Sequence, residues 1–249
     1  MSYISIDSST SSTTVVVFDN DLNIQAKFQK EHQQIYPSKG LVEHDLEEIY
    51  NNLIELMKKA AAISPEPQFI SMTNQRETFA LFDKFTGKPV RNAVVWQCTR
   101  GEKICENIMN NKEYSKLITQ KTGLKANTFF SASKLKWILE NEPNIKEGLL
   151  KGNILFGTID TYLLYRLTKC QEYATDTTNA SRTLLFNCIE NTWDSNLFSI
   201  FDIEQFDLAE VRPSSSNFGY SNFENSFRSE EHTSELQSLT NLVCRLLLE

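Results

Sequence analysis

The sequence lacks the features that mark several large classes of protein. Its 249 residues include five cysteines, an odd number without any C-x-x-C spacing, and three scattered histidines, which argues against a disulfide framework and a zinc site. No stretch approaches the length of a membrane span, and the chain does not start with the basic segment of a signal peptide. The net charge is −7, without a cluster of Lys and Arg that would form a nucleic-acid-binding face. We therefore expect a cytoplasmic protein whose partners include neither nucleic acid nor a membrane.

The glycine-rich Walker A pattern is also missing, which excludes the P-loop fold as a route to nucleotide binding. The hydrophobic content of 40% and the charged content of 23% are ordinary for a globular protein. The length fits one large domain or two small ones.

The first half of the chain alternates strand and turn patterns around one long helix. Three β-branched or alternating runs separated by short turns predict an antiparallel meander over residues 3–7, 13–19 and 24–32. Asp45 and Glu48 have the spacing of a capping box, and the apolar stripe that follows predicts a helix packed on a sheet. Further strands are expected at residues 68–72, 79–82 and 93–96.

The second half is predicted to be mostly helical from Thr99 onward. Ser131 is a candidate helix cap, residues 154–156 fit a short strand, and residues 158–167 fit a further helix. The Ser/Asn-rich residues 214–225 predict a loop or linker. A meander with parallel strands and flanking helices is an α/β fold, and this order resembles the ribonuclease-H-like core of the actin and sugar-kinase superfold.

An Arg-Glu pair follows the buried strand pattern at residues 68–72. Arg76 supplies several donors and Glu77 accepts, which suits a ligand with adjacent hydroxyl groups. The alternative is an exposed ion pair on a loop, a common and weak arrangement. The sequence on either side of Arg76 and Glu77 favours the interpretation as a ligand site.

Two other strand ends carry candidate binding groups. Asp7 precedes five small residues that let backbone N–H groups approach phosphate, although Ser/Thr-rich hairpins are common. Trp96 either packs in the protein core or forms a wall of a sugar or polyol pocket. Asp160 is expected in the opening turn of a helix and Asp176 in a capping loop, and neither has the context of a general base.

These segments, taken in order, resemble the FGGY carbohydrate kinases, and most closely the glycerol kinases. Residues 73–78 match the T-N-Q-R-E-T block of that family without change. Further blocks resemble it in the same order, at residues 7–14, 40–45, 83–89, 95–97, 130–139, 156–160 and 175–183.

The resemblance implies phosphorylation of a polyol's terminal hydroxyl with ATP and Mg²⁺. It implies four substrate-binding residues, Arg76, Glu77, Trp96 and Phe129. It also implies that Asp7 positions the metal through water and that the ATP phosphates contact Thr10, Ser11 and Ser12. Phosphoryl transfer depends mostly on positioning and charge neutralisation, which fits these roles.

Three positions depart from the glycerol kinase pattern. The family's Gln-Gly is Ser8-Ser9 here, and the hairpin arginine is Thr14. Phe129 stands where the family has a substrate-binding tyrosine, so one hydroxyl is lost from the site. Glycerol therefore remains the leading substrate, with another polyol or a ketose as the alternative.

The family's general base is an aspartate in a Gly-Asp-Gln block, and this sequence contains no such block. We therefore expect residues 1–227 to be the substrate-binding N-terminal domain, without the C-terminal ATP-binding domain and without turnover on its own. A non-catalytic polyol-binding pseudokinase domain is a further alternative. The oligomeric state stays open, with a homo-oligomer as one outcome.

Residues 228–249 form a separate segment in this interpretation. The run from Arg228 to Ser238 resembles the translation of a sequencing adapter and nothing in the kinases. The alternative is a native amphipathic helix, since leucines recur there at helical spacing. We predict a non-native tail.

Overall fold

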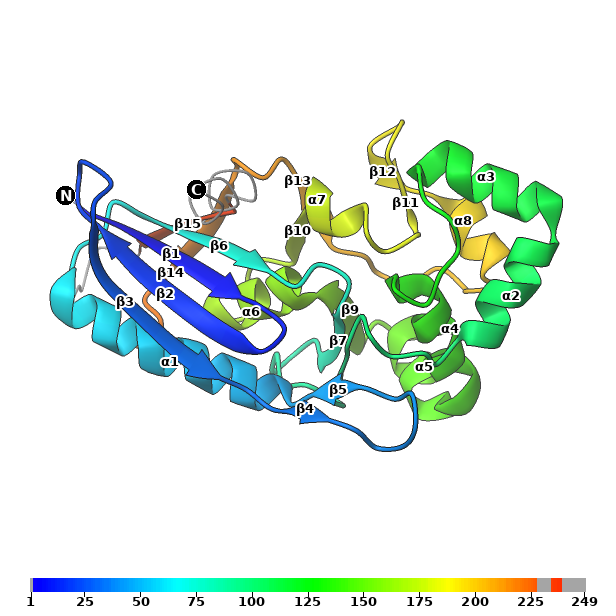
Figure 1. The fold of residues 1–249 in the computed structure, drawn as a ribbon, viewed down its shortest axis with the longest axis horizontal. Coiled ribbons are helices and arrows are strands. Elements are labelled where there is room, and N and C mark those ends of the chain that lie inside the picture. The colour runs from blue at the N-terminus through cyan, green and yellow to red at the C-terminus, as the bar shows by residue number, and fades with distance from the viewer. Residues whose placement is uncertain (1, 228–233, 239–249) are drawn as a thin grey trace.

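The computed structural model describes residues 2–227 and 234–238, and its main layer is a six-stranded sheet. The strands of this sheet are β1 (Tyr3–Ser8), β2 (Ser12–Phe18), β3 (Ile24–Glu31), β6 (Phe69–Asn74), β14 (Asn217–Ser221) and β15 (Ser234–Ser238). Their order is β14-β15-β6-β1-β2-β3 (Figure 1). β2 pairs antiparallel with both β1 and β3, as the meander prediction requires, whereas β6 runs parallel to β1 and to β15.

A second sheet packs beyond the end of the first. Its strands are β4 (Gln34–Ile35), β5 (Glu43–His44), β7 (Phe79–Asp83), β8 (Ala93–Val94) and β9 (Ile154–Thr158). They are antiparallel throughout, in the order β4-β5-β8-β7-β9. Two short pairs complete the strands: β10 (Ala174–Asp176) with β13 (Glu210–Arg212), and β11 (Phe186–Asn187) with β12 (Thr192–Trp193).

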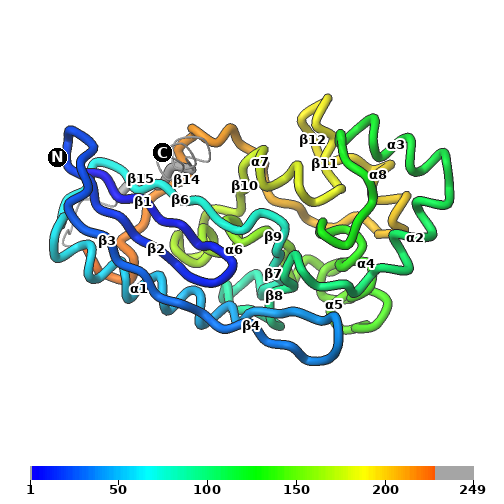
Figure 2. Tube along the Cα trace, in the orientation of Figure 1, coloured from blue at the N-terminus to red at the C-terminus, as the bar shows by residue number. Residues whose placement is uncertain are grey.

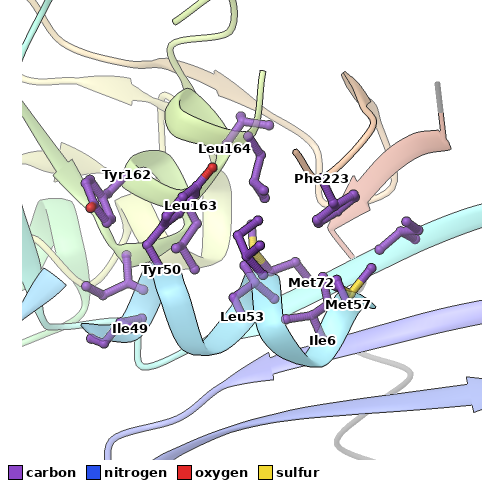
Figure 3. Close-up of a cluster of buried hydrophobic side chains, with 14 of the residues drawn as sticks. Ile6, Ile49, Tyr50, Leu53, Met57, Met72, Tyr162, Leu163, Leu164 and Phe223 are labelled. Carbon is purple, nitrogen blue, oxygen red and sulfur yellow. The ribbon is translucent and has the colours of Figure 1, made fainter. Parts of the chain in front are cut away.

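Eight helices in the described residues surround these sheets. They are α1 (Leu46–Ile63), α2 (Glu102–Asn110), α3 (Lys112–Thr122), α4 (Ser131–Asn141), α5 (Pro143–Leu150), α6 (Ile159–Leu167), α7 (Thr177–Ala180) and α8 (Ser195–Ile200). α1 and α6 contribute to one hydrophobic core with the main sheet. Figure 3 shows Leu53 and Met57 of α1 beside Ile6 of β1 and Met72 of β6. Burial of each such side chain contributes about 1.5–3 kcal/mol, so this core fixes the helices on the sheet.

The parallel pairing of β1 and β6 places two loops side by side. Asp7 pairs with Thr73 and Ser8 with Asn74, so both strands end at the same edge of the sheet. Gln75 N then donates to the carbonyl of Ser8 at 3.0 Å. The β1–β2 turn therefore points from this edge towards the middle of the molecule (Figure 2).

Several boundaries differ from the sequence prediction. Ser131 is not the helix cap, because α4 begins at Ser131 itself and the cap position is Phe130. The buried Ser131 hydroxyl instead donates to the carbonyl of Glu77 at 3.3 Å. β8 stops at Val94, so Trp96 lies in a turn, and the predicted loop over residues 214–225 contains β14.

The cap at the start of α1 is confirmed in part. The Asp45 carboxylate accepts hydrogen bonds from the backbone N of Glu47 and Glu48. The Glu48 carboxylate accepts from the backbone N of Gln33 at 3.1 Å, an interaction with the chain before β4.

The α/β fold class is confirmed, with the antiparallel meander, the parallel strands and the flanking helices in place. Among the described residues, every helix is too short or too polar to span a bilayer. Residues 228–233 and 239–249 of the predicted tail lie outside the described residues, and residues 234–238 form β15. The origin of the tail stays a prediction.

Gly101→Ala is expected to lower the free energy of unfolding by about 2 kcal/mol or more, because φ is positive and the space is filled. Gly101 has φ 92° at the start of α2, and a Cβ there would lie 2.6 Å from the carbonyl oxygen of Ser133. Urea unfolding measures the loss. Gly123→Ala is the matched control, since φ is 72° with no atom within 4 Å of the added Cβ. Equal losses in both variants would contradict the contact with Ser133.

Candidate functional site

Glu77 forms its ion pair with a residue far along the chain rather than with its neighbour Arg76. Arg182 Nε donates to Glu77 Oε1 at 2.7 Å, and the two side chains are 26% and 10% exposed. Arg76 is exposed, and within the described part of the chain no hydrogen bond or ion pair is recorded for its guanidinium. The local surface ion pair between Arg76 and Glu77 is therefore absent from the described residues, and Arg76 is open to a ligand.

An aromatic wall adjoins this ion pair. The ring centroids of Trp96 and Phe129 lie 4.8 Å apart, and those of Phe129 and Phe130 lie 5.6 Å apart. The Arg182 guanidinium lies 4.8 Å from the centroid of Phe130. The structure therefore joins the predicted substrate residues Glu77, Trp96 and Phe129 into one cluster.

Trp96 connects this wall to the β1–β2 turn. Its indole Nε1 donates to Thr10 Oγ1 at 3.0 Å, and its backbone N donates to Thr78 Oγ1 at 3.2 Å. The Thr78 hydroxyl in turn donates to Gln75 Oε1 at 2.7 Å. Thr10, which we expected at the phosphates, thus contacts Trp96, a predicted substrate residue.

Trp96→Phe is expected to weaken polyol binding by roughly fivefold to tenfold, because it deletes the hydrogen bond to Thr10 and keeps most of the aromatic surface. Titration calorimetry with glycerol checks this. Trp193→Phe is the control, since its indole Nε1 donates to the carbonyl of Ala209 outside the cluster. Equal effects of the two changes would contradict a local role for Trp96.

The turn is supported from behind by residues that the sequence analysis missed. His32 Nε2 lies 3.0 Å from the carbonyl oxygen of Ser9, and Gln75 Nε2 donates to the same oxygen at 3.4 Å. The rings of His32 and His44 lie 5.1 Å apart. Burial and the neighbouring His32 lower the pKa of His44 to about 4, so His44 is uncharged at neutral pH, and burial also lowers the pKa of His32. His32 and His44 looked scattered in the sequence because the fold, and not their spacing, brings their rings together.

The other predicted metal and phosphate residues of the β1–β2 turn lie along a groove on the main sheet. Asp7, Ser11 and Ser12 line a groove of about 730 Å³ there. Asp7 Oδ1 accepts from the Ser9 hydroxyl at 2.7 Å, and Ser12 Oγ accepts from Gln29 Nε2 at 2.9 Å. The structure therefore divides the predicted phosphate residues, with Thr10 towards Trp96 and the other two in the groove.

Asp7 is the only carboxylate among the described residues that line this groove. The described residues contain no cluster of three or more His, Cys, Asp or Glu side chains that would enclose a metal ion. Mg²⁺ commonly keeps several waters and binds through one or two carboxylates together with substrate phosphates. A single carboxylate beside hydroxyl groups fits that mode of binding.

Lys134 anchors the segment that carries Phe129. Its side chain is fully buried, and Nζ donates to the carbonyls of Thr128 at 2.6 Å and Phe129 at 2.9 Å. Burial lowers the pKa of Lys134 to about 7. Lys134 lies in the block at residues 130–139 that resembles the family, and no role was predicted for it.

The carboxylates of Asp160 and Asp176 are held by hydrogen bonds within the fold. Burial and the charge of Asp176 raise the pKa of Asp160 to about 6, and its two oxygens accept from the hydroxyls of Thr158 and Thr175. Asp176 caps α7 by accepting from Asn179 N at 2.8 Å. Asp160 therefore lies in the first turn of α6 and Asp176 caps α7, as the sequence predicted for each.

Comparison with known proteins identifies the family. A sequence model described as "FGGY family of carbohydrate kinases, N-terminal domain" matches residues 2–230. The chain belongs to the FGGY family. Curated FGGY relatives include the glycerol kinase of Shewanella pealeana, 45% identical over 221 residues, which are 87% of this chain and 45% of that protein. Glycerol kinase 2 of Thermotoga maritima is 45% identical over 225 residues, 88% of this chain and 45% of that protein.

A solved FGGY structure has the same fold. The Plasmodium falciparum glycerol kinase with ADP superposes with a TM-score of 0.87 and 36% identity, covering 95% of this chain and 47% of that one. The chain therefore spans a little under half the length of these FGGY proteins. It is a glycerol-kinase-like FGGY N-terminal domain.

Proposed function

We propose that this chain holds the polyol in an ATP-dependent kinase, and that the whole protein converts glycerol to glycerol 3-phosphate. One observation carries the proposal: Glu77, paired with Arg182, belongs to the same cluster as an aromatic wall that is hydrogen-bonded to the hairpin. The cluster offers a carboxylate beside apolar rings, and Arg76, the residue next to Glu77 in the sequence, is exposed. A polyol presents hydroxyl groups and C–H surface, so its chemistry complements both parts.

The residues act on the polyol by binding and orienting it. Glu77 Oε2 accepts a hydroxyl, Arg76 donates to the same or the next oxygen, and Trp96 with Phe129 covers the carbon chain. Such placement turns the reaction into an effectively intramolecular one, which is the main contribution a protein makes to phosphoryl transfer.

The transfer forms a bond between the terminal hydroxyl oxygen and the γ-phosphorus and breaks the bond from that phosphorus to the β–γ bridging oxygen, releasing ADP. Thr10, Ser11 and Ser12 are proposed to contact the ATP phosphates. Asp7 is proposed to hold Mg²⁺ through water, and the bound ion supplies charge neutralisation. The hydroxyl proton passes to a base, a role that we assign to no residue here because the sequence has no Gly-Asp-Gln block.

Phe129 supports a second candidate within the same family. Its ring packs on Trp96 and presents no hydroxyl to the substrate. A missing hydrogen-bonding group weakens the binding of glycerol by up to about 1–3 kcal/mol, which leaves another polyol or a ketose as the alternative substrate. The cytoplasmic location and the oligomeric state of the whole protein stay predictions.

An assay of ATP-dependent phosphorylation tests these candidates. The whole gene product is compared with the 249-residue chain, using glycerol, other polyols and ketoses as substrates. We expect glycerol turnover by the whole product and none by the chain alone. Turnover of a ketose in place of glycerol supports the second candidate, and no turnover of any substrate by the whole product supports a non-catalytic domain.

A further inference from the structure

We infer that Arg182 is a positioning residue of the polyol site and acts through Glu77. The inference rests on the proposed function, because the polyol is the ligand that Glu77 is positioned to bind. Arg182 follows α7 and lies 105 residues from Glu77 along the chain. Its task is to hold the Glu77 carboxylate in one direction while Arg76 stays free for the ligand.

The carboxylate of Glu77 is held through one oxygen. Arg182 Nε donates to Oε1 at 2.7 Å, whereas within the described residues no hydrogen bond is recorded for Oε2. The backbone of Glu77 is fixed as well, since its carbonyl accepts from the Ser131 hydroxyl at 3.3 Å. This arrangement leaves one oriented acceptor for a hydroxyl group.

Arg182 is itself held from two sides. Its guanidinium lies over the ring of Phe130 at 4.8 Å, and its backbone N donates to the carbonyl of Asn179 at 3.0 Å. Asn179 Oδ1 accepts from Asn74 Nδ2 at 2.9 Å, which ties α7 to the end of β6. Because a guanidinium is planar, stacking on a ring fixes its direction in a way that the flexible ammonium of lysine does not reproduce.

Charge explains why the site needs a second arginine. Glu77 is buried, and a buried carboxylate is costly unless a cation pairs with it. Lys134 also interacts with the charge of Glu77, but its Nζ is held by the carbonyls of Thr128 and Phe129. Without Arg182, the adjacent Arg76 would therefore turn to the carboxylate. Arg76 and Glu77 would then pair with each other, and neither would be available to the ligand.

A double-mutant cycle separates positioning from general stabilisation. Glycerol affinity is measured by NMR titration for the unchanged chain, Glu77→Gln, Arg182→Gln and the double variant. We expect Arg182→Gln to weaken glycerol binding by at least about tenfold, the loss of one hydrogen bond to a charged group. In the Glu77→Gln background, the same change should alter glycerol affinity less than about twofold, because the carboxylate that Arg182 positions is gone.

Arg212→Gln is the matched control. Arg212 also pairs with a glutamate, Glu172 at 2.9 Å, and lies over a phenylalanine, Phe218 at 5.8 Å. It belongs to β13, outside the cluster. Its replacement should leave glycerol affinity unchanged. Arg182→Lys is the conservative variant, which keeps the charge and is expected to recover part of the affinity that Arg182→Gln loses.

A second measurement needs no ligand. The Arg76 Nε–H signal should move on Arg182→Gln and stay in place when Glu77→Gln is also present, because only a carboxylate recruits Arg76. An unmoved Arg76 signal, or equal affinity losses in both backgrounds, would overturn the inference. If the unchanged chain binds no glycerol, polyol binding by this chain fails, and the Arg76 signal still decides the role of Arg182.

Discussion

Glu77→Gln is expected to weaken glycerol binding by about 10- to 100-fold, the largest effect on affinity among single changes in the cluster. The amide keeps the shape of the side chain and removes the charge. The polyol hydroxyl then loses a charged acceptor, and Arg182 loses the partner that its Nε contacts at 2.7 Å. Because Glu77 is only 10% exposed in its side chain, water replaces that partner poorly.

Titration calorimetry at constant pH measures this loss. Glu66→Gln is the matched control, since Glu66 is exposed and lies in the turn before β6. The control should bind glycerol like the unchanged chain. Unaltered binding by Glu77→Gln would remove Glu77 from the site.

Lys134 is expected to make the folded chain more stable as pH rises from about 7 to about 10.5. Burial lowers its pKa from 10.5 to about 7, so in this window the unfolded chain carries the proton and the folded chain does not. Stability rises with pH wherever the unfolded state binds more protons, here by up to about 1.4 kcal/mol per pH unit. Below pH 7 both states are protonated, and the contribution of Lys134 no longer changes.

Urea unfolding of Lys134→Met across pH 6 to 10 tests this. The difference in free energy of unfolding between the unchanged chain and the variant should shift in favour of the unchanged chain as pH rises. Lys103→Met is the control, because Lys103 is exposed on α2. A constant difference for Lys134→Met would show that Lys134 keeps its proton on folding.

The parts of the fold that follow from neighbouring residues could be predicted from the sequence. β-branched runs with short turns define the meander, and Asp45 with the apolar stripe defines the start of α1. No pairing partner was predicted for the strand at residues 68–72, so its parallel pairing with β1, which places the two loops side by side, was known only from the structure. The strand at residues 93–96 was predicted too long, since the turn at Trp96 is set by its hydrogen bond to Thr78.

The supporting residues of the site could not be found in this way. Arg182, His32 and Lys134 act on Glu77, Ser9 and Phe129, and most of these pairs are far apart in the sequence. Nothing in the residues beside Arg182 indicates that its partner is Glu77. A burial pattern around Lys134 gives the only local signal, since a lysine within an apolar helix face needs a partner.

The central claim is that the chain binds a polyol between Arg76, Glu77 and Trp96. The most direct test is a two-dimensional NMR titration of the chain with glycerol, following the Arg76 Nε–H and Trp96 Nε1–H signals. We predict saturable shifts of both signals, which in Glu77→Gln need about 10- to 100-fold more glycerol. Saturation of other signals while these two stay unmoved would contradict the claim.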